Sequence, residues 1–248
     1  RERKVDFLGK TVQVIPHITD EIKNRFVAVQ KRQRCDFIIT ELGGTVGDIE
    51  ALPYIEAVRQ FIWEVGRDNA IVCHLTLVPF LNAAKELKTK PTQHSVKMLS
   101  ELGIQPDIII CRSEHEISRD IRKKIALFCN VSEDAVIQAI DKSSIYEVPL
   151  ELQKEGIDKV VLRRLKMRSR KEPKLDKWKR FLTKLKKPKH EVRIALVGKY
   201  IELQDAYKSI YEAFVHAGAA KETKVIVDAI HSNSLTKSNA REILSQYD

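Results

Sequence analysis

The sequence has few of the features that mark membrane, secreted or metal-binding proteins. No apolar run reaches the roughly 18 residues that a transmembrane helix needs, and no apolar core follows the basic N-terminal stretch, as a signal peptide would require. The four cysteines form no C-x-x-C pair and have no histidine at metal-ligand spacing: Cys35, Cys73, Cys111 and Cys129. We therefore expect small buried thiols in a reducing compartment, which favours the cytoplasm, and no membrane partner.

Signatures of protein nucleophiles and of phosphate-binding loops are also missing. No stretch matches the Walker A pattern G-x-x-x-x-G-K-[ST], and the GKT at 9–11 resembles only its last residues. No Ser-His-Asp arrangement can be defended. His17, after Pro16, is more often a structural histidine than a catalytic one, and His94 in a first helical turn fits either role. The sequence thus predicts no protein nucleophile.

Positive charge is abundant, but it is confined to one segment. The net charge is +10, while residues 163–189 hold 14 Lys and Arg against Glu172 and Asp176, a net of +12 that leaves −2 elsewhere. This segment has no Gly/aromatic RNA-binding signature and no zinc-finger pattern. A solvated linker between domains is favoured over a nucleic-acid site, and we expect no nucleic-acid partner.

Strand-like and helix-like stretches alternate before this segment. Apolar runs predict strands at 11–19, 35–41, 69–80, 106–112 and 134–140. Helical spacing and end signals predict helices at 18–34, 49–68, 91–103 and 116–129. Strands that are apolar throughout and alternate with helices predict an α/β fold with a parallel sheet covered by helices on both faces.

After the basic segment the alternation starts again. A strand at 192–200, a helix at 203–219 and a strand at 224–232 predict one βαβ unit, the beginning of a second α/β domain. We predict domains at 1–162 and 191–248, joined by a linker at 163–190. Because the chain begins at Arg1 within an established pattern and stops before the second core is complete, we expect a piece of a longer protein.

Three acidic residues surround a glycine-rich stretch, ELGGTVGDIE at 41–50. Glu41 would follow a strand at the sheet edge where ligands of α/β proteins bind, and a carboxylate there suits Mg²⁺. Asp48 and Glu50 suit hydrogen bonds from ribose hydroxyls. The alternatives are a helix N-cap for Asp48 and a first-turn acid for Glu50.

Lysines precede a predicted helix start in KELKTKPTQ at 85–93. Lys85, Lys88 and Lys90 beside a helix N-terminus suit a polyphosphate, whereas the alternative is an exposed basic loop. Because the loop follows a predicted strand end, we favour the anion site. Lys124 alone would be a solvated surface lysine.

Seven blocks of the chain resemble, in the same order, those of CTP synthase. They are TVQVIPHIT (11–19), ELGGTVGDIE (41–50), KTKPTQHSV (88–96), PDIIICR (106–112), KIALFCNV (124–131), SSIYEVPL (143–150) and ALVGKYIELQDAYKSI (195–210). The resemblance implies a dethiobiotin-synthetase-like P-loop amidoligase domain, incomplete here. It also implies the beginning of a flavodoxin-like class I glutamine amidotransferase (glutaminase) domain.

The implied activity is ATP-dependent amination of UTP to CTP, in pyrimidine nucleotide biosynthesis. The 4-oxygen of UTP is phosphorylated with Mg-ATP, and ammonia from glutamine displaces the phosphate. The resemblance also implies GTP as an allosteric activator and a homotetramer whose nucleotide sites lie between subunits. Mg²⁺, ATP, UTP and glutamine are the implied cofactor and substrates.

The resemblance assigns roles to residues by matching motifs. Glu41 matches an Mg²⁺ ligand, and Leu8 and Gly9 match a loop near the ammonia passage. The matched UTP- or CTP-binding residues are Asp48, Ile49, Glu50, Lys88, Thr89, Lys90, Pro91, Thr92, Gln93 and Lys124. The stretch matched to the ATP base departs in detail from the family, so backbone contact is the safer expectation for Ile140, Asp141 and Lys142.

The family's ATP loop and second Mg²⁺-binding acid match no stretch of this chain, and neither do its glutaminase Cys, His and Glu. We therefore expect neither ligase nor glutaminase activity from this chain alone, and no catalytic residue within it. The alternatives are a truncated pyrimidine-nucleotide-binding paralogue without catalysis and another amide-forming ATPase of the same fold.

Overall fold

The computed structural model describes residues 7–32, 34–168 and 171–248, which divide into two compact units at 170/171. Residue 33 of the predicted helix 18–34 and residues 169–170 of the predicted linker lie outside this described part. No helix in the described part is long and apolar enough to cross a bilayer.

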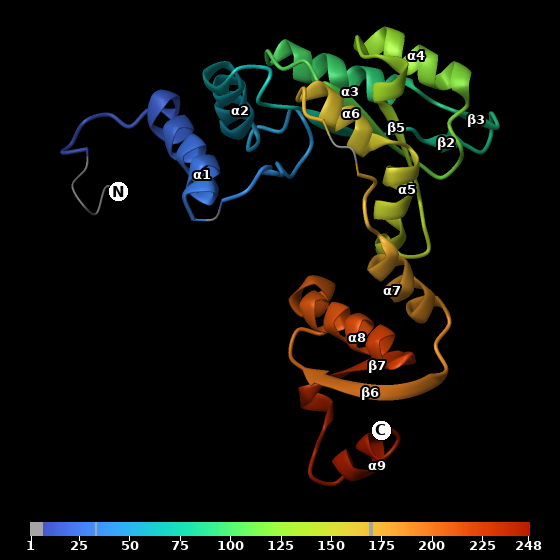
Figure 1. Ribbon diagram of the computed structural model, residues 1–248. Helices are drawn as coiled ribbons and strands as arrows, with labels where there is room; N and C mark the ends of the chain where they lie inside the picture. Colours follow the sequence, from blue (N-terminus) through green and yellow to red (C-terminus); the bar gives the residue numbers. More distant parts are fainter. Residues whose placement is uncertain (1–6, 33, 169–170) are drawn as a thin grey trace. The chain divides into compact units, whose positions relative to one another are not determined.

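A three-stranded parallel sheet forms the centre of the first unit (Figure 1). Its order is β1 (Cys73–Leu77), β4 (Ile108–Ser113) and β5 (Val136–Ile140), with Cys73 opposite Ile108 and Ile110 opposite Ile137. The isoleucines and valines of β4 and β5 favour the pleated, buried conformation. The predicted strands at 106–112 and 134–140 are therefore confirmed.

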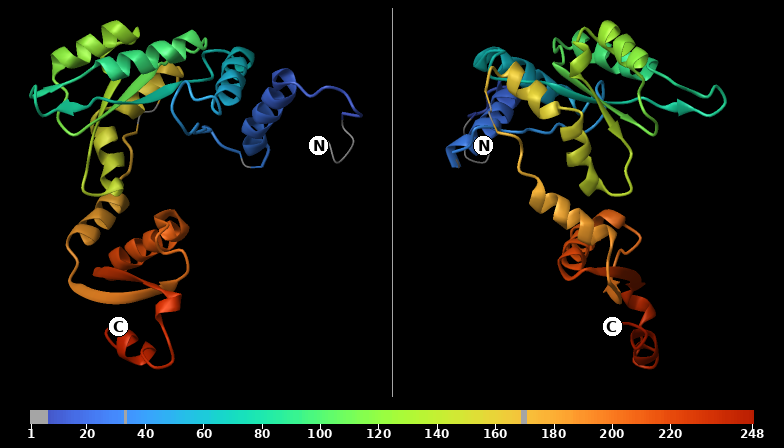
Figure 2. Two further views of the ribbon diagram at one scale, coloured as in Figure 1. Left: turned by 180° about the vertical axis from the view of Figure 1, so that it is seen from behind. Right: turned by 45° about the vertical axis from the view of Figure 1, so that its right-hand side comes forward.

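Helices cover this sheet on both sides (Figure 2). On one side α3 (Lys90–Glu101) and α4 (Arg119–Cys129) bury Val96 and Ile125 against Ile109. On the other, α5 (Val148–Lys154) and α6 (Ile157–Arg164) pack around Ile137 and Val160. The predicted helices at 91–103 and 116–129 are confirmed, as is a parallel α/β sheet.

Strand β1 is shorter and less covered than its apolar sequence predicts. The strand stops at Leu77, and after Pro79 a short hairpin follows, β2 (Phe80–Leu81) with β3 (Glu86–Leu87). His74 and Thr76 are buried, but Leu75 is 64% exposed and Leu77 56% exposed. The second face of β1 is thus open within the described residues, which corrects the expectation of cover on both faces.

Two predicted strands are wrong. Residues 35–41 form no strand and pair with none in the described part, and Ile39 is 94% exposed. Within 11–19, residues Val14–Ile18 form a π-helical turn (η2) that leads into α1 (Thr19–Arg32). A β-strand needs hydrogen-bonding partners for its backbone, and neither segment has them here.

Two helices precede the sheet in the sequence. Helix α1 packs against α2 (Leu52–Val65), with the rings of Phe26 and Phe61 5.5 Å apart and Lys23 2.5 Å from Glu64. Ile55 of α2 is buried with Leu99 of α3. The helices predicted at 18–34 and 49–68 are confirmed.

The second unit contains one βαβ unit, as the sequence predicts. Parallel strands β6 (His190–Gly198) and β7 (Thr223–His231) are joined by the short turn η5 (Gln204–Tyr207) and α8 (Lys208–Lys221). A Cβ added to Gly218 would lie 2.5 Å from the Thr223 carbonyl oxygen, so glycine allows α8 to approach β7 closely. Helix α7 (Asp176–Lys186) packs on α8, and α9 (Ala240–Leu244) follows β7.

The cysteines differ from the expectation of uniform burial. Cys111 and Cys129 are buried in the core beneath α4, but Cys35 and Cys73 are exposed. Cys35 lies in the unpaired segment and Cys73 on β1, whose one face is open. All four are free thiols.

Candidate functional site

The carboxyl ends of β1, β4 and β5 form one edge of the first unit's sheet. The backbone N–H of Val78 donates to the Arg112 carbonyl at 2.8 Å, and that of Asp141 donates to the Ser113 carbonyl at 3.0 Å. These bonds keep the segments that leave the three strands side by side. Ligands of parallel α/β sheets bind at this edge.

Lysines from two elements meet beside this edge. The N–H of Lys88 donates to the Pro79 carbonyl at 2.9 Å, which fixes the hairpin against the end of β1. The Lys88 ammonium forms an ion pair with Glu86. Lys88 first, and then Lys124 of α4, hold the pKa of the Glu86 carboxyl below its usual value. Lys88 and Lys124 therefore act on the same carboxylate.

The N-terminus of α3 carries the rest of the predicted lysine block. Thr89 is the N-cap residue, Lys90 and Pro91 open the helix, and Lys90 is exposed. The Nε2 of Gln93 donates to Thr89 Oγ1 at 3.0 Å. Backbone N–H groups, the helix dipole and Lys90 together favour an anion at this helix start.

Thr92 has a supporting position. It is fully buried, and its hydroxyl lies 3.1 Å from both Thr76 Oγ1 and the Leu77 carbonyl oxygen. These contacts attach the first turn of α3 to the end of β1. A contact from Thr92 to a ligand would therefore have to come from its backbone.

The loop 43–50, which carries Asp48 and Glu50, lies against the C-terminal end of α3. The N–H of Thr45 donates to Asp48 Oδ2 at 3.2 Å, and Val46 packs in the cluster around Leu99. Gly47 has φ +102°, and a Cβ there would lie 2.5 Å from Met98 Sδ. Because Met98 lies eight residues after Lys90, the two ends are about 12 Å apart along α3. Asp48 and Lys90 are therefore associated with opposite ends of α3, and one chain does not bring them together.

The two structural alternatives for these acids are wrong. Helix α2 begins at Leu52, its N-cap residue is Ala51, and no acidic residue lies in its first turn. Asp48 therefore does not cap the helix, and Glu50 lies outside its first turn. Asp48, Ile49 and Glu50 are all exposed, with Ile49 82% exposed.

Glu41 is not at the end of a strand, because residues 35–41 form none. It lines a pocket of about 510 Å³ between that segment and α1, together with Arg25 and Phe26. No ion pair holds its carboxylate within the described residues, and there no three His, Cys, Asp or Glu side chains converge. Glu41 alone would supply one carboxylate ligand.

The residues matched to the ATP base follow β5 at the carboxyl edge. Arg112 Nε donates to Asp141 Oδ1 at 2.7 Å and holds the pKa of that carboxyl below its usual value. Lys142 Nζ lies 3.1 Å from Glu151 on α5. Because both side chains are engaged, contact through the backbone of Ile140–Lys142 remains the favoured expectation.

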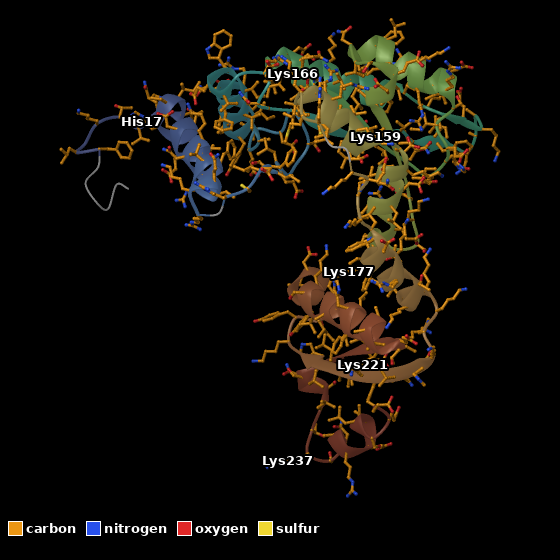
Figure 3. All side chains as sticks on the ribbon, viewed as in Figure 1. His17, Lys159, Lys166, Lys177, Lys221 and Lys237 are labelled. Carbon is orange, nitrogen blue, oxygen red and sulfur yellow. The ribbon has the colours of Figure 1, made fainter. Side chains whose placement is uncertain are left out.

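Near the N-terminus, Leu8 and Gly9 form an exposed turn closed by a bond from the Lys10 N–H to the Phe7 carbonyl, 2.8 Å long. The ring of His17 accepts from the Gln13 N–H at 2.9 Å and lies edge-on to Phe7, its position labelled in Figure 3. These contacts are local. The role matched to Leu8 and Gly9 stays a prediction.

The basic segment is partly helical. In α7 the ring of Phe181 stacks on His216 of α8 with centroids 5.3 Å apart, and Lys184 pairs with Glu222 at 3.3 Å. Lys189 pairs with the same carboxylate at 2.5 Å. Figure 3 labels two exposed lysines of this segment, Lys166 and Lys177. The other lysines labelled there lie outside the segment and are also exposed: Lys159, Lys221 and Lys237. Residues 176–186 thus belong to the second unit as a packed helix.

Two features beside this site were not predicted from the sequence. Glu86 was overlooked among the lysines, although alternation along a strand places residues 86 and 88 on one side. The contact between Gly47 and Met98 joins two distant segments, so no local pattern could predict it.

These features define an α/β protein that presents cations and a helix N-terminus at the carboxyl edge of a parallel sheet, a class suited to phosphate-bearing ligands. Residues 1–167 match the family described as CTP synthase N-terminus. The chain is 61% identical over 248 residues to the CTP synthase of Flavobacterium psychrophilum, covering 100% of this chain and 46% of that protein. It is 54% identical over 247 residues to the CTP synthase of Methanocaldococcus jannaschii, covering 100% of this chain and 45% of the relative.

This chain belongs to the CTP synthase family, in which it contains the N-terminal, amidoligase region. The predicted resemblance is confirmed. The chain spans about half the length of the curated relatives it matches.

Proposed function

We propose that this chain is the pyrimidine-nucleotide-binding part of a CTP synthase, which aminates UTP to CTP with ATP and with ammonia from glutamine. The observation that carries the proposal is the ion pair of Lys88 with Glu86 just before the N-terminus of α3, where Lys90 is exposed, together with Lys124 of α4, which also lowers the pKa of the Glu86 carboxyl. Several cations beside free helix N–H groups suit a triphosphate.

The acids at Asp48 and Glu50 complete the proposed nucleotide site from another copy of the chain. Within one chain they lie by the opposite end of α3 from Lys90. The exposed acids suit ribose hydroxyls, and the lysines suit phosphates. A homotetramer in which the two ends of α3 face different nucleotides fits this separation, and Ile49 would contact the base.

Glu41 fits the role of a single Mg²⁺ ligand. Mg²⁺ commonly binds one or two carboxylates and completes its shell with waters and substrate phosphates, so a three-residue cluster is not required. Glu41 is exposed and, in the described part, has no ion-pair partner. When bound, the ion would offset the negative charge of the phosphates. Glu41 itself would orient its carboxylate toward the bound nucleotide.

The proposal extends to the rest of the chain. Ile140–Lys142 would contact the ATP base through their backbone. Residues 191–248 would begin the glutaminase domain after the linker predicted at 163–190, whose helix α7 packs on that domain's α8, and GTP would activate the whole enzyme. The βαβ unit of β6, α8 and β7 supports such a beginning. Free thiols and the family's biosynthetic role favour the cytoplasm.

A binding measurement on the 248-residue chain tests the nucleotide site. We expect CTP and UTP to bind, and Lys90→Gln to weaken CTP binding by about tenfold, because a charge-assisted hydrogen bond is lost. Isothermal titration calorimetry at fixed salt gives both dissociation constants.

The matched control is Lys97→Gln, which removes the same charge from an exposed position further along α3. It should leave CTP affinity nearly unchanged. Equal losses in both variants would mean that CTP senses only net charge, and the assignment of Lys90 would then be wrong.

A further inference from the structure

Glu86 is an acid placed among cations. Lys85, Lys88 and Lys90 lie within four residues of it in sequence, and the charge of Lys124 on α4 adds to that of Lys88 in lowering the pKa of its carboxyl. Its carboxylate forms an ion pair with Lys88, while Lys90 has no ion-pair partner in the described residues. A carboxylate in this position presents to Lys88 the same kind of oxygen that a phosphate would.

The hairpin geometry fixes this arrangement. Glu86 and Leu87 form β3 and Lys88 follows directly; the side chains of Glu86 and Lys88 meet in the ion pair, while Leu87 packs toward the core. Leu87 packs against the core cluster together with Ile121 of α4. Lys124 lies about one helical turn after Ile121, so the two residues share one face of α4. Because Ile121 packs on the same cluster as Leu87, this face is the one nearest the hairpin.

The Glu86–Lys88 pair contributes little to folding. The two side chains are 54% and 39% exposed, and exposed ion pairs add little net stability because solvent screens them. The packing of Leu87 and the backbone bond from Lys88 to Pro79 already hold the hairpin. The role of Glu86 is therefore to be sought in the chemistry of the lysines.

We propose that Glu86 is an internal counter-anion that occupies Lys88 when no ligand is bound and that a polyphosphate must displace. This inference rests on the proposed nucleotide site and deepens it. Glu86 keeps Lys88 beside Lys124 in the empty site, where the two like charges would otherwise repel. Its displacement and its repulsion of the incoming phosphates lower the affinity, so that bound nucleotide can exchange.

Neutralising this carboxylate should strengthen anion binding. In Glu86→Gln, Lys88 is no longer neutralised and the repulsion is gone. We expect inorganic tripolyphosphate and CTP to bind about two- to fivefold tighter, the range of an exposed ion pair. Calorimetry with both probes, on the 248-residue chain at fixed salt, measures the change.

Two controls separate this role from others. Glu101→Gln makes the same charge change at the far end of α3, where Glu101 lies 3.9 Å from Lys97. It should not tighten binding. In a Lys88→Gln background, Glu86→Gln should give a smaller gain, because only the repulsion of the phosphates is then relieved and no ion pair has to be displaced. A purely structural Glu86 would instead give weaker binding and a lower melting temperature.

The possible binding results distinguish failure of the Glu86 proposal from failure of the proposed nucleotide site. Unchanged or weaker binding in Glu86→Gln, or an equal gain in Glu101→Gln, overturns the role of Glu86 alone. A wild-type chain that binds tripolyphosphate but not CTP overturns the pyrimidine site, while the Glu86 comparison still stands on tripolyphosphate. If the wild-type chain binds neither probe, the lysines form no phosphate site and both proposals fail.

Discussion

Cys111 and Cys129 lie in the core beneath α4, where burial raises the pKa of their thiols to about 12 and about 11 respectively. Cys35 lies exposed in the unpaired segment. For Cys73, burial of part of the side chain and then the carboxylate of Asp107 raise the thiol pKa, although the residue is exposed. Since the thiolate is the reactive form, the four residues should differ in reactivity.

Alkylation of the native chain should follow that order. With iodoacetamide at pH 8, we expect Cys35 to be modified first, Cys73 more slowly, and Cys111 and Cys129 only after unfolding. Peptide mass spectrometry over a time course measures each site. Native-state labelling of Cys111 as fast as that of Cys35 would show that the core around α4 opens freely.

Side-chain roles were partly predictable at this scale. Lys88 and Lys90 were identified by charge and position, and Lys124 by resemblance alone; the structure places Lys88 after β3, Lys90 at the start of α3 and Lys124 within α4, and their roles stay predictions. The supporting contacts of Thr92 and the pairing of Arg112 with Asp141 were not. Such contacts join residues that are distant in sequence, so they depend on how the strands are ordered.

At the scale of secondary-structure elements, the backbone path of the loop 43–50 depends on Gly47. Gly47 adopts φ +102° and lies against Met98, while Val46 packs beside Leu99. Residues with a Cβ are strained at this φ. The loop therefore keeps Asp48 close to α3 only if position 47 remains glycine.

We expect Gly47→Ala to lower the free energy of unfolding by about 1–3 kcal/mol, from backbone strain and the displacement of Met98. Gly43→Ala is the matched control, because a Cβ there has nothing within 4 Å. It should change stability by less than about 0.5 kcal/mol. Urea denaturation followed by circular dichroism compares them, and equal effects would show that the strain at Gly47 is not what matters.

Hydrophobic pattern predicted the type of most elements but not whether each strand has a partner. β4, β5, β6 and β7 were recognised from apolar runs, and each pairs with at least one neighbouring strand in the described chain. The run at 35–41 has equal propensity, yet Ile39 stays exposed because nothing in the described part pairs with it. Propensity is local, whereas pairing depends on the tertiary arrangement.

On the scale of the whole molecule, the chain consists of two compact units. The first unit is built on β1, β4 and β5, and the second on β6 and β7. The division at 170/171 falls within a segment rich in Lys and Arg. Connections between compact units are preferred sites of proteolytic cleavage.

Limited digestion with trypsin should therefore cut first after Lys171 or Lys174, both exposed, and leave two fragments that persist. The sites within α7 should resist longer, because that helix packs on α8. Gel electrophoresis with terminal sequencing locates the cuts. Early cleavage inside α7, before any cut at Lys171 or Lys174, would contradict the assignment of this helix to the second unit.

The open face of β1 also affects how the isolated chain should be handled. Leu75 and Leu77 expose much of their surface, and among the described strands β1 pairs only with β4. Its free edge carries backbone donors and acceptors that another molecule can use, and an edge of this kind is a template for aggregation. Aggregation should therefore increase as protein concentration rises, and dilute solutions should keep the chain soluble.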